Sequence, residues 1–310
     1  MAVSTLRTRQ AQWRLYYKFC VQYKLTALPA TSGTLCLFVA YMASKGFEYS
    51  STLNYLHSLS ALHNYQNLAG PPINHFSVMQ ALAGLKKQRQ DRPHKKLPIT
   101  IEILLFISKN ITALPSRTRT AFWAACLIAF FTLLRRSNLF PAKNNKSFLT
   151  VGNVIKKDNL YYVAAKQIKT TKFEACKVNL PLPLIPGSNL CPTSAIKRQL
   201  VSLHSHAAAS LFADISQSGR IKPLTASRFT KYLRTILSMS NYPAQSYSAH
   251  SFRRGGATFA SSISIPTDCL KAQGQWRSSC YQQYVSRDDA HRLKFAQGMA
   301  TAISSDVYDA

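Results

Sequence analysis

The chain has 310 residues, in which 39 lysines and arginines stand against 11 aspartates and glutamates, so its formal net charge is +28. A charge of this size predicts a polyanionic partner, and its spread along the chain favours a protein that encloses nucleic acid over one with a basic arm. No long basic amphipathic helix dominates, which disfavours a membrane-surface protein. The only adjacent acidic pair is Asp288-Asp289, which disfavours a metal-dependent nuclease.

Seven cysteines are scattered along the sequence without a CxxC pair, which predicts free thiols in a reducing compartment and no zinc site. The most apolar run, residues 121–134, is too short to cross a bilayer and is flanked by arginines, so it predicts a buried helix. The sequence begins without an apolar signal core, and we therefore expect an intracellular protein.

The first ninety residues predict four helices, at about 5–23, 31–46, 51–68 and 75–89. Apolar side chains recur at helical spacing, and Thr31 can cap the second helix. The fourth helix becomes strongly basic at Lys86 and Lys87. These lysines could form a solvated face, but their one-sided charge favours contact with a DNA backbone.

A linker is predicted at residues 93–99, because proline, charge and the absence of periodicity coincide around Arg92-Pro93-His94-Lys95-Lys96. We therefore expect one domain at 1–92 and a second at 100–310. A short basic linker would allow the two to close around a duplex.

The second domain is predicted to mix helices and strands. Strands are expected at 147–155, 160–167 and 175–182, and helices at 193–205 and 226–239. The predicted fold class is mainly α with a small antiparallel β-sheet. The lysine-rich stretch between the second and third strands either protects a sheet edge or reaches into a bound strand.

The most distinctive chemistry lies between residues 248 and 285. His250 and Arg253 are three residues apart, so on a helix they project from one face toward a shared target. A titratable imidazole beside a fixed guanidinium suits an oxyanion. Gly255 and Gly256 allow close approach of another helix or a ligand. Two tyrosines follow, and a phenol can act as a nucleophile where cations stabilise the developing charge.

Six residues in their order along the chain resemble the active site of the tyrosine recombinase (phage integrase) superfamily: Arg135, Lys169, His250, Arg253, Trp276 and Tyr284. Fragments at 134–139, 169–173, 250–257 and 274–276 look most similar to recombinases of eukaryotic mobile elements of the DIRS-like and Crypton kind. The resemblance covers nearly the whole chain. It implies a helical core-binding DNA-clamp domain at 1–92 and a mixed α/β catalytic domain at 100–310.

Carried over residue by residue, the resemblance makes Tyr284 the nucleophile that attacks a DNA phosphate and becomes a 3′-phosphotyrosyl. Arg135 and Arg253 would clamp the non-bridging oxygens, Lys169 would protonate the departing 5′-hydroxyl, and His250 would assist proton transfer. Such chemistry depends on positioning and fixed positive charge, so neither a metal nor another cofactor is expected.

The sequence departs from the family pattern at two positions. Asn138 stands where many relatives have an acidic residue, and Gln275 stands where many have a histidine nine residues before the nucleophile. Trp276, which follows, can donate one hydrogen bond to a phosphate oxygen but cannot transfer a proton.

Three assignments have a neighbouring competitor. Tyr281 competes with Tyr284, although the family spacing favours Tyr284. Arg136 competes with Arg135 in the same way, after an apolar helix whose dipole either arginine could complement. Arg254 likewise competes with Arg253.

The resemblance implies a site-specific recombinase or integrase that works on double-stranded DNA as a homo-tetramer on two sites, in the nucleus, with no membrane or small-molecule substrate. The apolar stripe in residues 288–310 would serve as an intramolecular cap or bind a neighbouring subunit. One alternative is a type IB topoisomerase-like enzyme that relaxes DNA as a monomer. The other is a catalytically inactive domesticated DNA-binding protein.

Overall fold

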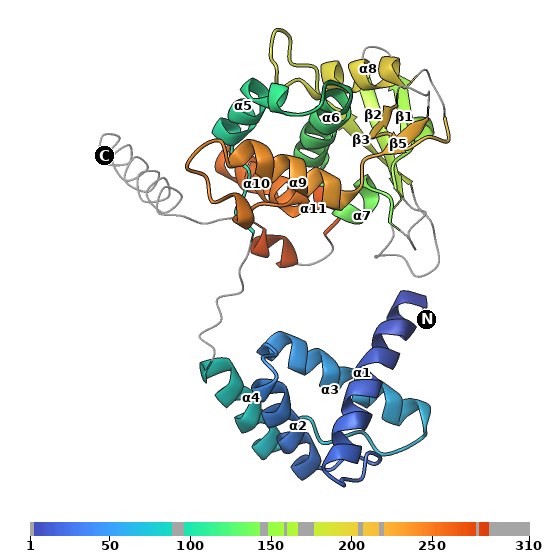
Figure 1. Ribbon diagram of the computed structural model, residues 1–310, viewed down its shortest axis with the longest axis vertical. Coiled ribbons are helices and arrows are strands. Elements are labelled where there is room, and N and C mark those ends of the chain that lie inside the picture. The colour runs from blue at the N-terminus through green and yellow to red at the C-terminus, as the bar shows by residue number, and fades with distance from the viewer. Residues whose placement is uncertain are drawn as a thin grey trace, which may run out of the picture. The chain divides into compact units, whose positions relative to one another are not determined.

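The computed structural model describes residues 3–88, 96–142, 148–157, 160–166, 177–203, 207–216, 220–276 and 279–284. The chain divides into two compact units, residues 1–94 and 95–310 (Figure 1). This division falls within the stretch predicted as a linker, and the roles expected for the two domains stay predictions. The fold class is confirmed: helices predominate, with a small antiparallel sheet.

The first unit consists of the four predicted helices, with bounds α1 (Val3–Gln22), α2 (Ser32–Ser44), α3 (Tyr49–Tyr65) and α4 (Phe76–Gln88). Thr31 caps α2 as expected, because its side chain accepts a hydrogen bond of 3.1 Å from the Thr34 amide. Large apolar side chains from every helix share one core, among them Tyr16, Phe38, Leu56 and Leu82.

The second unit packs helices around small sheets. Its helices are α5 (Ile101–Lys109), α6 (Ser116–Thr132), α7 (Arg136–Leu139), α8 (Pro192–Ser202), α9 (Ala226–Leu237), α10 (Ala249–Ser262) and α11 (Thr267–Gly274). Short 3-10 turns are η1 (Ile111–Ala113), η2 (Val151–Asn153), η3 (Ala244–Ser246) and η4 (Ser279–Gln283).

The strands of the second unit are β1 (Val154–Lys157), β2 (Leu160–Lys166) and β3 (Lys177–Leu182), which pair antiparallel in that order, and a hairpin of β4 (Ala213–Ile215) and β5 (Ile221–Pro223). The first strand predicted at 147–155 was mostly wrong. The turn η2 occupies residues 151–153, where the Asn153 side chain accepts a hydrogen bond of 2.8 Å from the Thr150 amide and closes a local loop. A side chain that bonds its own backbone in this way competes with strand pairing.

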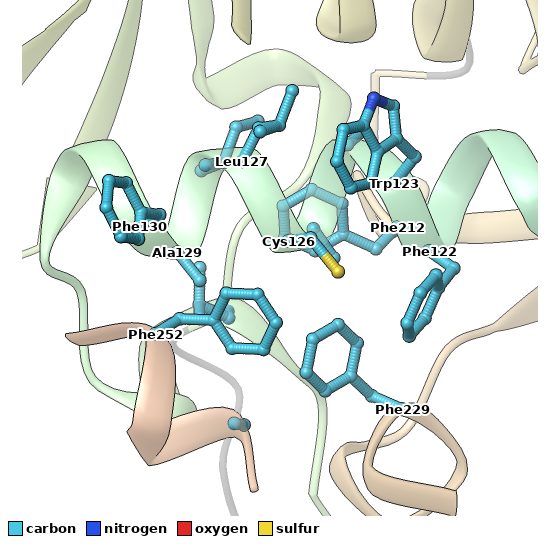
Figure 2. Close-up of a cluster of buried hydrophobic side chains, with 14 of the residues drawn as sticks. Phe122, Trp123, Cys126, Leu127, Ala129, Phe130, Phe212, Phe229 and Phe252 are labelled. Atoms are coloured by element: carbon cyan, nitrogen blue, oxygen red, sulfur yellow. The ribbon is translucent and has the colours of Figure 1, made fainter. Parts of the chain in front are cut away.

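Helix α6 forms the centre of the second unit, and the run from Ala121 to Phe130 is buried on all sides. Figure 2 shows Phe122 and Cys126 of α6 facing Phe229 of α9, with Phe252 of α10 beside them. A helix that is apolar all round must be buried, so this prediction is confirmed. Within the described ranges, none of the helices combines the length and the apolar character that a membrane crossing requires.

Helix α10 lies backbone to backbone against its neighbours. A Cβ added to Gly256 would lie 2.1 Å from the Phe130 carbonyl oxygen of α6, and one added to Gly255 would lie 1.9 Å from the Ile99 carbonyl oxygen. Real side chains do not tolerate such distances, so both positions require glycine. The close approach that the glycine pair predicts is therefore confirmed.

Residues 96–99 belong to the second unit, although the linker was predicted to include them. The Leu97 amide donates to the Ser246 carbonyl at 2.9 Å, and the Ile99 amide donates to the Ser251 carbonyl at 3.0 Å. These hydrogen bonds fix the path by which the chain enters the second unit, alongside η3 and α10. Sequence reasoning missed them because they depend on residues about 150 positions further along the chain.

We predict that Gly256→Ala destabilises the second unit by about 3 kcal/mol or more, because the new methyl group forces α10 away from α6. Thermal or denaturant unfolding measures the change. Gly84→Ala is the matched control: nothing lies within 4 Å of its added Cβ in α4, so we expect a gain of roughly 0.5–1 kcal/mol there. Equal effects of the two substitutions would contradict the packing argument.

Candidate active site

The candidate site is built around Arg253, whose side chain is only 2% exposed. Its Nη1 donates a hydrogen bond to the Leu133 carbonyl, and its Nη2 donates to the Gly274 carbonyl at 2.8 Å. The guanidinium carbon lies 4.2 Å from the ring centroid of Trp276 and 5.0 Å from that of Tyr284. Hydrogen bonds and aromatic faces thus hold the cation in one orientation.

The two carbonyls that bind Arg253 come from the ends of helices. Helix α6 ends at Leu133, which has a positive φ of 52°, and α11 ends before Gln275, which has a positive φ of 54°. The last carbonyls of a helix have no partner within it and carry partial negative charge. One guanidinium therefore satisfies the exposed ends of two helices and joins α6, α10 and α11.

Arg135 and Arg136 follow Leu133 after one intervening residue and lie at the start of α7. Arg135 is half-buried and caps α7, where its carbonyl accepts from the Asn138 amide at 2.8 Å. Desolvation first, and then the charge of Arg135, lower the pKa of Arg253 to about 10. Arg136 is exposed and instead lines a groove along α9. The geometry thus associates Arg135 with Arg253.

Asn138, which departs from the family pattern, is a buried residue of α7. Its backbone carbonyl accepts a hydrogen bond from the Leu149 amide at 2.8 Å, and its Oδ1 accepts from the Ser137 hydroxyl at 3.4 Å. These contacts connect α7 to the segment that leads into β1. Asn138 therefore stabilises the turn that carries Arg135. It does so with an amide side chain, where the family pattern has a charged carboxylate.

Tyr284 lies among the other candidate residues. Its ring centroid is 5.1 Å from that of His250 and 5.2 Å from that of Trp276. The Thr258 hydroxyl of α10 donates to the Tyr284 carbonyl at 3.3 Å, which ties the tyrosine backbone to the same helix as His250. Tyr284 is therefore the phenol beside both the imidazole and Arg253.

Tyr281 faces a different neighbourhood. Its ring centroid is 6.3 Å from that of Trp276, and the Lys271 ammonium lies 5.6 Å from it. The family spacing favours Tyr284 over Tyr281, and of these two described rings it is Tyr284 that lies beside His250 and Arg253.

His250 is the second residue of α10 and has an exposed edge, and the Ser248 hydroxyl accepts a hydrogen bond from its amide at 3.3 Å. Partial burial of the ring, followed by the charges of Arg253, Arg254, Arg136 and Arg135, lowers its pKa from the ordinary 6.5. The lowered pKa favours the neutral imidazole, which can accept a proton. Arg254, the competitor of Arg253, is also buried, and burial lowers its pKa.

Three buried nitrogen atoms at this site have no hydrogen-bond acceptor within the described residues: Arg253 Nε, Gln275 Nε2 and Trp276 Nε1. All three residues are more than nine-tenths buried. Buried donors nearly always have partners, and leaving one unsatisfied costs about 1–3 kcal/mol. The Arg253 guanidinium lies over the Trp276 ring, so two of these donor residues are in direct contact, and such donors suit an oxyanion as acceptor.

Sequence reasoning missed two supports of the site. A Cβ on Gly274 would lie 2.0 Å from the Trp276 ring, so only glycine lets the indole fold back over the end of α11. The Gln273 side chain donates to the Phe131 carbonyl at 2.8 Å and joins α11 to α6. A glycine two residues before a tryptophan is a weak signal for the first support, and no sequence pattern indicates the second.

Lys169, the remaining predicted site residue, lies outside the described residues, as does the tail at 288–310. Of the six, the structure therefore brings together Arg135, His250, Arg253, Trp276 and Tyr284. The described part of the chain contains no group of three or more histidine, cysteine, aspartate or glutamate side chains that could hold a metal ion.

A groove of about 630 Å³ begins at Arg136 and follows α9 to η3. Lys231 and Arg234 contribute further positive charge, and Arg234 is held in place because its Nε and Nη2 donate to the Tyr247 and Gln245 carbonyls, each at 3.2 Å. Among the residues that the structure describes, no acidic side chain lines the groove. Its charge and its position beside Arg135 suit a chain of phosphates.

No family model and no curated protein matches the sequence. Several solved structures share the fold. The Tn1549 transposon integrase in complex with transposon right end DNA has a TM-score of 0.63 at 15% identity, over 96% of this chain and 94% of that one.

A lambda integrase dimer bound to a COC′ core site has a TM-score of 0.60 at 14% identity, over 92% of this chain and 89% of that one. The XerH site-specific recombinase, in a post-cleavage complex with palindromic difH substrate, has a TM-score of 0.57 at 16% identity, over 93% of this chain and 76% of that one. The chain therefore has the tyrosine recombinase fold, as the sequence resemblance predicts.

We predict that His250 titrates below pH 6.5 in the free protein and at higher pH when a DNA phosphate is bound, because the anion stabilises the imidazolium. NMR titration of the imidazole measures both values. The unfolded chain binds this proton at higher pH, so its contribution to stability is lost as the pH falls below about 6.5. His250→Gln removes that contribution and serves as the control, and a His250 pKa unaffected by DNA would contradict the prediction.

Proposed function

We propose that the protein is a site-specific DNA recombinase or integrase of the tyrosine recombinase family, which cleaves and rejoins DNA through a 3′-phosphotyrosyl intermediate. The observation that carries the proposal is the position of Tyr284, whose ring centroid lies 5.0 Å from the Arg253 guanidinium and 5.1 Å from the His250 ring. The fold shared with DNA-bound integrases supports it.

In the cleavage step, the Tyr284 oxygen attacks the phosphorus, a new P–O bond forms, and the bond to the 5′-oxygen breaks. The phenol proton goes to His250, whose lowered pKa leaves it neutral and able to accept. The departing 5′-oxygen takes a proton from Lys169. Rejoining is the reverse reaction with a 5′-hydroxyl as nucleophile, so the ester keeps the bond energy and no nucleotide cofactor is needed.

The pentavalent transition state carries extra negative charge on its non-bridging oxygens. Arg135 and Arg253 supply fixed positive charge, and the unpartnered Arg253 Nε and Trp276 Nε1 are donors without a competing acceptor among the described residues. Donors fixed before the reaction stabilise developing charge without reorganisation. This arrangement accounts for a reaction that needs no metal ion.

The phosphate backbone would reach the site along the α9 groove. Arg136, Lys231 and Arg234 line it and would bind successive phosphates next to the one that reacts. Each phosphate contact releases counterions, so affinity should fall steeply with salt.

The biological setting belongs to the same proposal. Assembly as a homo-tetramer on two DNA sites, residence in the nucleus and descent from a eukaryotic mobile element rest on the sequence resemblance. The exposed Lys86 and Lys87 agree with DNA contact by the first unit.

We predict that Tyr284→Phe abolishes covalent trapping, because the phenol oxygen forms the bond. The protein is incubated with chelator on candidate element-end DNA with a nick beside the cleavage position, and denaturation-resistant adducts are measured. Tyr281→Phe is the matched control and should keep the adduct. Loss in Tyr281→Phe alone would reverse the assignment, whereas tight binding without any adduct would favour the inactive DNA-binding protein. Relaxation of any plasmid by a monomer would favour the topoisomerase-like enzyme.

We predict that Lys169→Ala slows cleavage by roughly 10²–10⁴-fold, because the 5′-oxygen then leaves without a proton. A substrate with sulfur in place of that oxygen should restore the rate, since a thiolate is a good leaving group. Single-turnover cleavage of the two substrates measures the effect, with Lys172→Ala as a control from the same segment. Equal slowing on both substrates would assign Lys169 another role.

A further inference from the structure

The backbone of Tyr284 is bonded to α10 through the side chain of Thr258. The Thr258 hydroxyl donates a hydrogen bond of 3.3 Å to the Tyr284 carbonyl. Thr258 is half-buried and lies two helical turns after His250. The tyrosine is therefore attached to the same helix that carries the imidazole and the guanidinium of the candidate site.

The direction of Tyr284 along α10 follows from its two contacts with this helix. His250, Arg254 and Thr258 are spaced four residues apart and form one row on α10. The Cα atoms at the two ends of this row are roughly 12 Å apart, because a helix rises about 1.5 Å per residue. The Tyr284 carbonyl lies at the Thr258 end, whereas the Tyr284 ring centroid is 5.1 Å from that of His250. Tyr284 thus lies along the helix, with its ring directed toward the helix N-terminus.

Other contacts of Tyr284 restrict its position less. Its amide donates to the Tyr281 carbonyl at 2.8 Å, but this bond lies within the segment 279–284 and would move with it. Its ring packs against an apolar cluster made of Leu133, Ala257, Leu270 and Trp276. Apolar packing has no preferred direction, whereas a hydrogen bond requires a particular distance and angle. The Thr258 hydroxyl therefore adds a directional contact from outside the segment.

We propose that Thr258 is a positioning residue for the cleavage reaction, and that its hydroxyl holds the Tyr284 backbone so that the phenol lies beside Arg253 and His250. The inference rests on the proposed function, in which the Tyr284 oxygen attacks phosphorus. Thr258 acts through the tyrosine backbone, not through the DNA. A displacement of about 1 Å at a reacting group can slow a reaction by about 10²-fold. Loss of this hydrogen bond should therefore slow cleavage while leaving DNA binding unchanged.

The test compares three substitutions in the whole chain. Thr258→Val keeps the shape of the side chain but removes the hydroxyl, so it cannot donate to the Tyr284 carbonyl. Thr258→Ser keeps the hydroxyl and should restore the contact. Thr267→Val makes the same chemical change at an exposed position at the start of α11 and is the matched control. Thermal unfolding shows that each variant is folded at the assay temperature.

Single-turnover covalent trapping at saturating nicked DNA separates the rate of adduct formation from the affinity for DNA. We expect Thr258→Val to form the adduct about 10–100-fold more slowly with an unchanged Kd, and the other two variants to stay within about 3-fold of wild type. A purely structural role would lower the unfolding temperature and leave the rate of the folded protein unchanged. An unchanged rate in Thr258→Val, or equal slowing in Thr258→Ser, would overturn the inference.

A second measurement follows the Tyr284 ring without any reaction. Fluorotyrosine is incorporated, and the Tyr284 fluorine signal is assigned by its loss in Tyr284→Phe. We expect Thr258→Val to shift this signal and to weaken the Overhauser contact between the Tyr284 and His250 rings, whereas Thr258→Ser and Thr267→Val should keep both.

The two measurements together separate this inference from the proposed function. If wild type forms no adduct on its site but Thr258→Val displaces the ring, the recombinase is overturned and the hold of Thr258 on Tyr284 is supported. If wild type forms the adduct and Thr258→Val changes neither the rate nor the ring signal, the recombinase stands and the role of Thr258 is overturned.

Discussion

The buried guanidinium of Arg253 is the constraint on which the second unit depends. A cation removed from water is costly unless its hydrogen bonds are satisfied, and here the ends of α6 and α11 provide two acceptors. The third group, Nε, has no acceptor within the described residues, and desolvation followed by the charge of Arg135 lowers the pKa of Arg253. The described residues therefore leave the positive charge of Arg253 uncompensated beside the phenol of Tyr284.

That arrangement exists only because α10 approaches its neighbours so closely. Gly255 and Gly256 remove the side chains that would separate α10 from Ile99 and Phe130, and the arginine one turn earlier can then reach the carbonyl of Leu133. The left-handed residues Leu133 and Gln275 end the two helices where their carbonyls face inward. Backbone geometry thus positions the cation together with the aromatic faces of Trp276 and Tyr284.

The sequence predicts much of this fold, but it predicts fewer of the contacts that hold the candidate site residues in place. The helices and the buried run at 121–134 follow from periodicity, because burial imposes a regular pattern on side chains. The strands β4 and β5 have three residues each, too few to show any pattern, and η2 replaces most of a predicted strand. The family spacing favours Tyr284 over Tyr281, but the place of its ring beside His250 and Arg253 depends on how this segment packs against α10, which spacing does not encode. The carbonyls that hold Arg253 are identical in every residue type, so no sequence pattern could have identified them.

The groove along α9 bears on how a protein with a net charge of +28 would hold DNA under the proposed function. Phosphates are the same in every DNA sequence, so the cations along α9 would bind any duplex and position it at the proposed reactive residues. Selectivity needs groups that distinguish one base from another, and these are mostly neutral donors and acceptors. Under the proposed function, chemistry and recognition can then change independently, because a substitution among neutral groups leaves the charges of Arg135 and Arg253 untouched.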